Sequence, residues 1–322
     1  MLSRRDVLMG AAAAGAAALG GRVSRALAKA SQPATRVDFD VPAGACDCHT
    51  HIFGDPRHFP FAAGRIYTPE PASVAEMRSL HRALHTERVV LVQPSVYGTD
   101  NACTLDAMKQ LGRSSRGIAV IDEKTTQAAL DNMHRAGIRG IRINLETAGQ
   151  TDPGVGRQRL QAAIERIKGR RWHVQIYTRL PVIEGMADLV MASPVPIVFD
   201  HFGGAQGSLG VQQPGFETLL KLVRAGKAYV KLSAPYRSST QAPDYPDIAP
   251  LAKALIAANP ERTLWATDWP HPAQIPGRKF DEVTPLYHID DGRVFNLLPR
   301  WVPAAAQRRT ILVSNPAKLY DF

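Results

Sequence analysis

The sequence predicts a (β/α)8 TIM barrel, a single domain that follows an N-terminal export segment. Eight runs of apolar or β-branched residues alternate with segments of helical periodicity. Several of these runs are apolar almost throughout, which is typical of parallel strands covered on both faces. A chain of 322 residues with 45% hydrophobic content is long enough for one such barrel. A doubly wound open sheet is the alternative, although no glycine-rich phosphate loop follows the first run.

The predicted elements follow one another without a linker or an internal repeat. The expected strands are 45–53, 87–95, 116–122, 137–145, 173–179, 196–203, 228–237 and 262–271. The expected helices are 74–85, 104–111, 127–135, 158–168, 183–191, 216–224 and 248–258. Ser73 and Thr125 are candidate N-caps of the first and third helices. We therefore expect residues 31–322 to form the barrel domain.

Residues 1–30 are typical of a signal peptide. The stretch Ser3-Arg4-Arg5-Asp6-Val7-Leu8-Met9 resembles a twin-arginine export motif. The apolar run 9–20 that follows is too short and too weakly hydrophobic for a lasting membrane anchor. We expect export by the twin-arginine machinery, cleavage after Ala28 or Ala30, and a periplasmic product.

The net charge indicates which class of ligand to expect, and the cysteine content indicates whether disulfides form. Lys+Arg of 39 against Asp+Glu of 29 gives +10, and without the first 30 residues the balance is 34 against 28, or +6. This charge is spread along the chain without a long basic run, which favours small anionic substrates over nucleic acid. Cys46, Cys48 and Cys103 cannot all pair. We interpret them as packing residues, with Cys46 and Cys48 on the outward face of the first strand.

The first strand carries two histidines that share a face. In a strand, residues two apart point the same way, so we expect Asp47, His49 and His51 to lie together. Two imidazoles beside each other at a strand end hold a metal ion or polarise a substrate oxygen. The alternative is a pair of buried, hydrogen-bonded histidines.

Polar residues recur where the predicted strands end, the edge at which barrel enzymes place their chemistry. They are His49, His51, Ser95, Asp122, Arg142, Tyr177, His201, Arg237 and Asp268. Asp268 is the strongest candidate, because an acid between Trp265 and Trp269 at the end of a buried strand is usually paired or functional. We interpret Asp122 as structural. Ser95 as a turn residue and Tyr177 as a strand-end aromatic are the alternatives to a binding role.

These residues stand in a series of short motifs that runs through nearly the whole mature chain. The motifs are HTHIFG at 49–54, FPF at 59–61, YTP at 67–69, VQPS at 92–95, GTDN at 98–101, GIRGIR at 137–142, DHFG at 200–203, KLS at 231–233, TDWPHP at 267–272 and NPAKLY at 315–320. In this order they resemble the amidohydrolase superfamily, and within it the lactone hydrolases related to 2-pyrone-4,6-dicarboxylate lactonase.

The resemblance implies a role for each candidate. Asp268 would activate water as the base, and His49, His51 and His201 would surround the lactone carbonyl oxygen. The substrate-binding residues would be Tyr67, Ser95, Arg142, Tyr177 and Arg237. A carboxylate base with donors aimed at developing negative charge is also what ester hydrolysis needs on chemical grounds. The planar fork of arginine suits a carboxylate or sulfonate.

Two departures from the superfamily pattern bear on metal and substrate. The fourth and fifth strands offer Arg142 and Tyr177 where metal ligands often stand, so a two-metal site is not expected. One zinc on His49, His51 and Asp268, with His201 as a further candidate ligand, and metal-free hydrolysis both remain open.

The second departure is Ala148 and Gly204, which stand where the pyrone lactonases carry further basic residues. We therefore predict a hydrolase for an anionic lactone, a sulfo- or carboxy-substituted muconolactone or a pyrone dicarboxylate. The alternatives are a lactone isomerase, a metal-dependent decarboxylase on the same barrel, and an exported binding protein without turnover. Asp268 together with three histidines disfavours the last of these.

Overall fold

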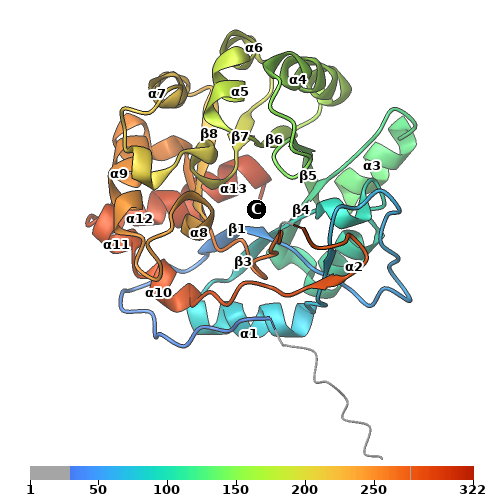
Figure 1. Cartoon of the computed structure of the whole chain (residues 1–322), viewed down its shortest axis with the longest axis horizontal. Coiled ribbons are helices and arrows are strands. Elements are labelled where there is room, and N and C mark those ends of the chain that lie inside the picture. The colour runs from blue at the N-terminus through green and yellow to red at the C-terminus, as the bar shows by residue number, and fades with distance from the viewer. Residues whose placement is uncertain (1–29, 276) are drawn as a thin grey trace, which may run out of the picture.

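The computed structural model describes residues 30–275 and 277–322, and these form a parallel eight-stranded barrel surrounded by helices (Figure 1). The strand order is β1-β3-β4-β5-β6-β7-β8-β9, and each pairing is parallel. The strands are β1 Cys46–Thr50, β3 Arg88–Val92, β4 Ser115–Ala119, β5 Ile138–Asn144, β6 His173–Tyr177, β7 Ile197–Phe199, β8 Ala228–Ser233 and β9 Thr263–Ala266. The predicted fold class is confirmed. The predicted export signal lies outside the described residues.

The first and last strands meet through the residues that follow β9. The amide of Asp268 donates to the carbonyl of His49 at 2.9 Å, and the amide of His51 donates to the carbonyl of Trp269 at 2.8 Å. These two hydrogen bonds join the two edges of the sheet, so the open, doubly wound alternative is wrong. The seam of the barrel therefore runs through the two stretches that carry the strongest candidate residues.

The helices cover the barrel in chain order. They are α1 Val74–Leu84, α2 Ala102–Leu111, α3 Gln127–Arg135, α4 Pro153–Ile167, α5 Leu180–Gly185, α6 Ala187–Ala192, α7 Phe216–Arg224, α8 Pro235–Ser238, α9 Ala249–Ala258, α10 Asp291–Phe295, α11 Leu298–Trp301, α12 Ala305–Arg309 and α13 Asn315–Tyr320. Ser73 caps α1 in a reciprocal capping box with Glu76. Thr126, and not the predicted Thr125, caps α3. The helix predicted at 183–191 is two short helices, because the backbone leaves helical geometry at Met186.

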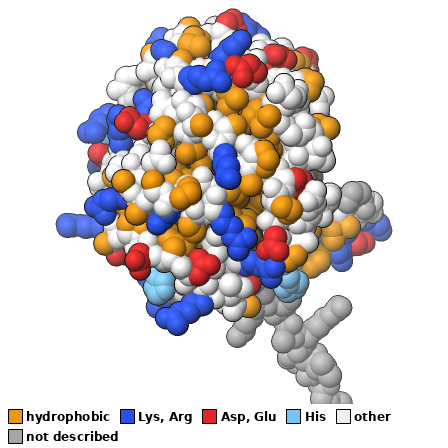
Figure 2. Space-filling model, turned by 90° about the vertical axis from the view of Figure 1, so that its left-hand side faces the viewer, with side chains coloured by type: hydrophobic (Ala, Val, Ile, Leu, Met, Phe, Trp, Pro, Cys, Tyr) orange, Lys and Arg blue, Asp and Glu red, His pale blue; other side chains and the backbone are white. Residues whose placement is uncertain are grey.

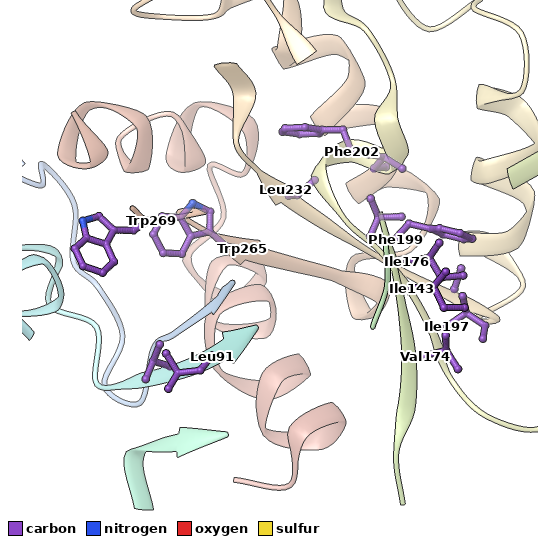
Figure 3. Packing of buried hydrophobic residues seen from close by; sticks show 14 of the residues in the cluster. Leu91, Ile143, Val174, Ile176, Ile197, Phe199, Phe202, Leu232, Trp265 and Trp269 are labelled. Atoms are coloured by element: carbon purple, nitrogen blue, oxygen red, sulfur yellow. The ribbon is translucent and has the colours of Figure 1, made fainter. Parts of the chain in front are cut away.

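The larger core lies between the strands and the helices. Figure 3 shows the strand side chains Leu91, Ile143 and Ile176 in this layer, together with Phe202 and Trp265. Most of this apolar surface is removed from water, and its burial is the main stabilising term of the fold. A rigid barrel of this kind holds the strand ends, and therefore the polar side chains on them, at fixed separations.

A β-bulge in β1 changes which residues face the barrel interior. Asp47 pairs with Val89 but Thr50 pairs with Leu91, so one extra residue is accommodated between them. Cys46 and Cys48 consequently pack in the inner cluster with Val90, Val92 and Ile118, and the prediction that these cysteines face outward is wrong. The prediction that the cysteines are packing residues is confirmed, since Cys46, Cys48 and Cys103 are all free and buried.

The same bulge separates Asp47 from the two histidines with which it was predicted to lie. Asp47 accepts hydrogen bonds from the side chain of Thr267 at 2.6 Å and from His81 on α1 at 3.3 Å, both outside the barrel lumen. His49 follows Cys48 on the inner face because the extra residue resets the alternation. The two-residue alternation thus failed in β1, the strand that carries His49.

The C-terminus closes the end of the barrel opposite the site. In Figure 1 the chain end lies at the centre of the ring of strands. The guanidinium groups of Arg88 and Arg116 lie over the ring of Phe322 at 5.2 and 4.6 Å. Arg139 pairs with Asp321 at 3.3 Å, so it lies at the end of the barrel away from the site.

The basic side chains are scattered over the face of the molecule that Figure 2 shows. On the face that carries α7, α9, α11 and α12, lysines and arginines stand among apolar and acidic side chains and form no continuous stripe (Figure 2). Within the described residues, none of the helices combines the length and the apolar character that crossing a bilayer requires.

Candidate active site

One oxygen of Asp268 faces three imidazoles at the floor of a pocket. Its Oδ1 atom lies 3.5 Å from Nε2 of His49, 3.5 Å from Nε2 of His51 and 3.7 Å from Nε2 of His201. All four side chains are nearly fully buried, and this Oδ1 has no hydrogen-bond partner among the described residues. Asp268 and His201 both adopt positive φ, 69° and 47°, a strained conformation that is common at functional sites.

The other oxygen of Asp268 is fixed by two donors. Oδ2 accepts a hydrogen bond from the hydroxyl of Tyr236 at 2.6 Å and from Nε of Arg237 at 2.7 Å. Burial opposes ionisation of this carboxyl, but Arg237 and the neighbouring histidines hold its pKa well below the usual range. Asp268 is therefore ionised at neutral pH, with Oδ2 occupied and Oδ1 free to accept a proton.

The three histidines are neutral at physiological pH. Burial lowers the pKa of His201 to about 4 and lowers the pKa values of His49 and His51, although the nearby carboxylates oppose the effect. Nδ1 of His51 contacts the carbonyl of Val92 at 2.7 Å, and Nδ1 of His201 contacts the hydroxyl of Ser233 at 2.8 Å. Each ring is thus held by its Nδ1 atom while its Nε2 atom points toward Asp268.

A second polar layer lies beneath the histidines, inside the barrel. Nζ of Lys231 lies 3.2 Å from Asp200 Oδ1 and 3.2 Å from His49 Nδ1, and it donates to Oε1 of Gln175 at 2.7 Å. Asp200 Oδ1 also contacts His49 Nδ1 at 3.2 Å, and its Oδ2 accepts from Nε2 of Gln175 at 3.1 Å. All of these groups are fully buried, so their charges and hydrogen bonds are compensated by one another and by Arg142, whose Nε lies 3.7 Å from Asp200 Oδ2.

The pocket above this floor gathers nearly all of the predicted site residues. Its wall and floor are formed by His51, Tyr67, Pro94, Ser95, Arg142, Asn144, Thr147, Tyr177, His201, Arg237, Asp268, Pro272 and Gln274. The five predicted substrate-binding residues are all among them. His49 lies just below the pocket surface and reaches it through its contact with Asp268.

Arg237 is placed differently from the prediction, and Asp122 lies outside the pocket. Arg237 was placed at a strand end, but β8 ends at Ser233 and Arg237 lies on α8, from which its Nη2 donates to the carbonyl of Pro272 at 3.0 Å. The reason is that Ala234 turns the chain with φ 49°, so the apolar run does not continue as a strand. Asp122 is exposed and hydrogen-bonds within its own turn to Thr125, in agreement with the structural interpretation.

Four residues of the hydrogen-bond network around Asp268 and His49 were not predicted from the sequence. They are Gln175, Asp200, Lys231 and Tyr236. A lysine in the middle of an apolar strand, and an aspartate directly before His201, were visible signals that a buried charge pair was present. Tyr236 gave no such signal, because its role depends on how α8 folds back over Asp268.

The pocket-floor atoms have the spacing of ligands around one zinc ion. His49, His201 and Asp268 offer donor atoms within 4.8 Å of one another. Nε2 of His49 and His51 and Oδ1 of Asp268 are 3.3 to 3.5 Å apart, close to the roughly 3.3 Å between ligands of a tetrahedral zinc with bonds of about 2.0 Å. The donor set therefore fits a zinc ion, which would polarise a carbonyl or acidify a bound water.

The local charge favours an anion over a cation in this pocket. Asp200 and Asp268 contribute two negative charges, whereas Arg142, Lys231 and Arg237 contribute three positive charges, so the cluster carries +1 with neutral histidines. A zinc ion would raise this to +3 in a buried site, where charge repulsion is strong. A bound anion would instead lower it.

Known proteins match this chain over nearly its whole length. The amidohydrolase family profile matches residues 46–322. A 2-pyrone-4,6-dicarboxylate hydrolase of Comamonas testosteroni is 34% identical over 295 residues, 89% of this chain and 93% of that one. A 4-sulfomuconolactone hydrolase of Rhizobium radiobacter is 34% identical over 289 residues, 88% and 92% of the two chains. A solved structure from Pseudomonas putida is 30% identical with a TM-score of 0.72, covering 87% of this chain and 98% of that one. The chain belongs to the amidohydrolase family.

Proposed function

We propose that this protein hydrolyses an anionic lactone, with Asp268 as the general base. The observation that carries the proposal is that the two carboxylate oxygens of Asp268 have different surroundings. Oδ2 is held by Tyr236 and Arg237, while Oδ1 is unpaired beside three imidazoles at the floor of a positively charged pocket. Two similar relatives are named as hydrolases of lactones, which supports the same reaction class for this chain.

The geometry supports the following sequence of proton transfers. A water molecule beside Oδ1 of Asp268 loses a proton to that oxygen as it attacks the lactone carbonyl carbon. The negative charge that develops on the carbonyl oxygen is stabilised by hydrogen-bond donation from an imidazole that carries its proton on Nε2. Collapse of the tetrahedral intermediate breaks the ring C–O bond, and Asp268 returns the proton to the leaving oxygen. The products are a carboxylic acid, which releases its proton to the solvent, and a hydroxyl or enol on one open chain.

The low pKa of Asp268 restricts the substrates that this base can serve. A carboxylate held well below its usual pKa is fully ionised but only weakly basic. Such a base is adequate when the leaving oxygen is itself acidic, as in an enol or otherwise activated lactone. We therefore favour an activated, anionic ring over an ordinary sugar lactone.

The two arginines of the pocket supply the recognition of negative charge. Nη1 of Arg142 donates to the carbonyl of Gln93 at 3.3 Å. Arg142 also lines the pocket, so other N–H groups of its guanidinium remain for a ligand. Arg237 uses Nε and Nη2 within the protein, so it has less donor capacity left for a ligand. Arg142 is accordingly the main anion contact, and Tyr67, Ser95 and Tyr177 complete the pocket wall.

The choice among anionic lactones rests on two sequence positions outside the pocket lining. Ala148 and Gly204 supply no positive charge, so a pyrone dicarboxylate would find fewer partners than a muconolactone with a sulfonate or carboxymethyl group. The test is an assay of purified protein against these lactones and a neutral lactone of the same ring size. Hydrolysis of the anionic rings supports the proposal, and equal or faster hydrolysis of the neutral ring opposes it.

We also propose that the protein is exported by the twin-arginine route to the periplasm. The support is the sequence of residues 1–30, with Arg4 and Arg5 before an apolar run. Replacing both arginines by lysine should retain the protein in the cytoplasm of an expressing bacterium. Cell fractionation measures this, and unchanged periplasmic recovery would contradict it.

A further inference from the structure

We propose that Lys231 is a positioning residue that fixes the proton of neutral His49 on Nε2, and thereby makes His49 the oxyanion donor of the pocket. The inference about the proton rests on hydrogen-bond geometry alone, and its catalytic consequence rests on the proposed lactone hydrolysis. The starting point is that Nδ1 of His49 lies 3.2 Å from two groups of opposite character, the ammonium of Lys231 and the carboxylate of Asp200.

The hydrogen-bond inventory of Lys231 decides between these two partners. An ammonium has three donors and no acceptor. Lys231 has three acceptors within reach, Gln175 Oε1 at 2.7 Å, Asp200 Oδ1 at 3.2 Å and His49 Nδ1 at 3.2 Å. The side chain is fully buried, so no solvent replaces a missing partner. If Nδ1 of His49 carried the proton, the third donor of Lys231 would face an N–H group and remain unpaired, which is unfavourable in a buried site.

Both carboxylate oxygens of Asp200 accept hydrogen bonds without a proton on Nδ1 of His49. Its Oδ1 accepts from Lys231, and its Oδ2 accepts from Nε2 of Gln175 at 3.1 Å, with Nε of Arg142 3.7 Å away. Gln175 is itself oriented by its neighbours, since its oxygen faces a group that only donates and its nitrogen faces a group that only accepts. The whole layer is therefore satisfied when Nδ1 of His49 is unprotonated.

His51 has the opposite tautomer, with its proton on Nδ1. Its Nδ1 lies 2.7 Å from the carbonyl of Val92, which only accepts, so the proton of neutral His51 is on Nδ1. Its Nε2 is then a lone pair, 3.3 Å from Nε2 of His49. Of these two neighbouring rings, only His49 carries an N–H on Nε2, just below the pocket surface and 3.5 Å from Oδ1 of Asp268. His51 accepts there, beside the base Asp268, and cannot donate to a carbonyl oxygen while it is neutral.

The direct test is the location of the two protons in the unliganded wild-type protein. Histidine labelled with ¹⁵N on both ring nitrogens gives one-bond proton correlations that identify the protonated nitrogen, and His49→Gln and His51→Gln variants assign the two rings. We expect Nε2–H for His49 and Nδ1–H for His51. A proton on Nδ1 of His49 would overturn the proposal, and this result needs neither a substrate nor a Lys231 variant.

The variant test uses Lys231→Met, which keeps the length of the stem and removes the donor. We expect the proton of His49 to move to Nδ1 and donate to Asp200, kcat to fall by about 10²–10³-fold as for loss of an oxyanion donor, and KM to change little. Because the variant removes the cation that balances the charge of Asp200, Lys231→Met/Asp200→Leu is the charge-balanced companion. It also removes the acceptor of a proton on Nδ1 of His49, so we expect the proton to return to Nε2 and kcat to recover part of the loss. Unchanged kcat in folded Lys231→Met, or an equal loss of kcat in the double variant, would contradict the proposal. If the wild-type protein hydrolyses no lactone, the function above fails while the proton locations still test the role of Lys231.

Discussion

Nε of Arg237 donates to Oδ2 of Asp268 at 2.7 Å, and this pairing leaves Oδ1 as the oxygen that faces the three histidines. The pair ties α8, which follows β8, to the second residue after β9, beside the seam at which the barrel closes. It has two effects on chemistry. It keeps the carboxylate ionised, and it orients the free oxygen into the pocket.

The first prediction is that Asp268→Asn lowers kcat by about 10²–10⁴-fold with a much smaller change in KM, because the amide keeps the shape but cannot accept the proton of water. Steady-state kinetics with the best lactone of the panel measures this, and circular dichroism checks that the variant is folded. A folded variant that keeps more than about a tenth of the wild-type kcat would rule out Asp268 as the base.

A second prediction separates the two arginines. Arg142→Met should raise KM by about 10- to 150-fold, the value of one charge-assisted contact of roughly 1.5–3 kcal/mol, and should lower kcat less. Arg142→Lys is the matched control, which keeps the charge and should recover part of the affinity. An unchanged KM in Arg142→Met would show that this residue does not hold the anion.

Arg237→Met should instead lower kcat as well as raise KM, because Arg237 also holds the base. Loss of its charge removes the main influence that lowers the pKa of Asp268, so that pKa should rise. The rate of the wild-type enzyme should be independent of pH between about pH 5 and 8, since Asp268 is ionised and His201, with a pKa of about 4, is neutral there. The acid limb of the pH–rate profile should move to higher pH in the variant. Identical acid limbs in the two proteins would argue against the pairing in solution.

Metal removal tests the charge argument at the pocket floor. We predict that prolonged treatment with a chelator leaves kcat unchanged, and that purified active protein contains zinc well below one ion per chain. The reason is that the site already carries +1 without an ion. Stoichiometric zinc, lost together with activity in His49→Ala, would establish the metal-dependent alternative that the ligand spacing allows.

Acid stability gives a prediction that does not depend on the reaction. His173 is fully buried at the end of the barrel away from the site, and burial lowers its pKa to about 3. The unfolded chain binds a proton at this residue below about pH 6.5 and the folded chain does not, so the free energy of unfolding falls as pH falls through that window. At pH 4 the loss is roughly 3 kcal/mol. His173→Gln should flatten this slope in urea denaturation between pH 7 and pH 4, and parallel slopes would contradict the assignment.

The fold was predictable because hydrophobic periodicity repeats eight times in one pattern, and most of the candidate site was predictable because barrel chemistry lies at strand ends. The details that failed depend on contacts between distant segments. The bulge at Asp47–Thr50 reversed the expected faces of Cys46 and Cys48, and no local signal marks where an extra residue is accommodated. Tyr236 and Arg237 reach Asp268 only because the chain turns at Ala234.

The hydrogen-bond network under the histidines could not be predicted from the sequence for a related reason. Lys231 and Asp200 are each conspicuous as charges in apolar surroundings, but only the barrel closure shows that they share a contact with His49. A single strand gives the face of a residue and not its partner across the lumen. Pairing across a closed barrel is therefore the part of this site that required the structure.

The measurement that bears most directly on lactone hydrolysis at this site is turnover of an anionic lactone in H₂¹⁸O, with mass spectrometry of the product. We predict a ring-opened product that carries one ¹⁸O in its new carboxylate, formed by the wild-type protein and reduced by about 10²–10⁴-fold in Asp268→Asn. A product that keeps its ring and contains no ¹⁸O would indicate isomerisation, and absence of any product from the anionic lactones would contradict the proposed function.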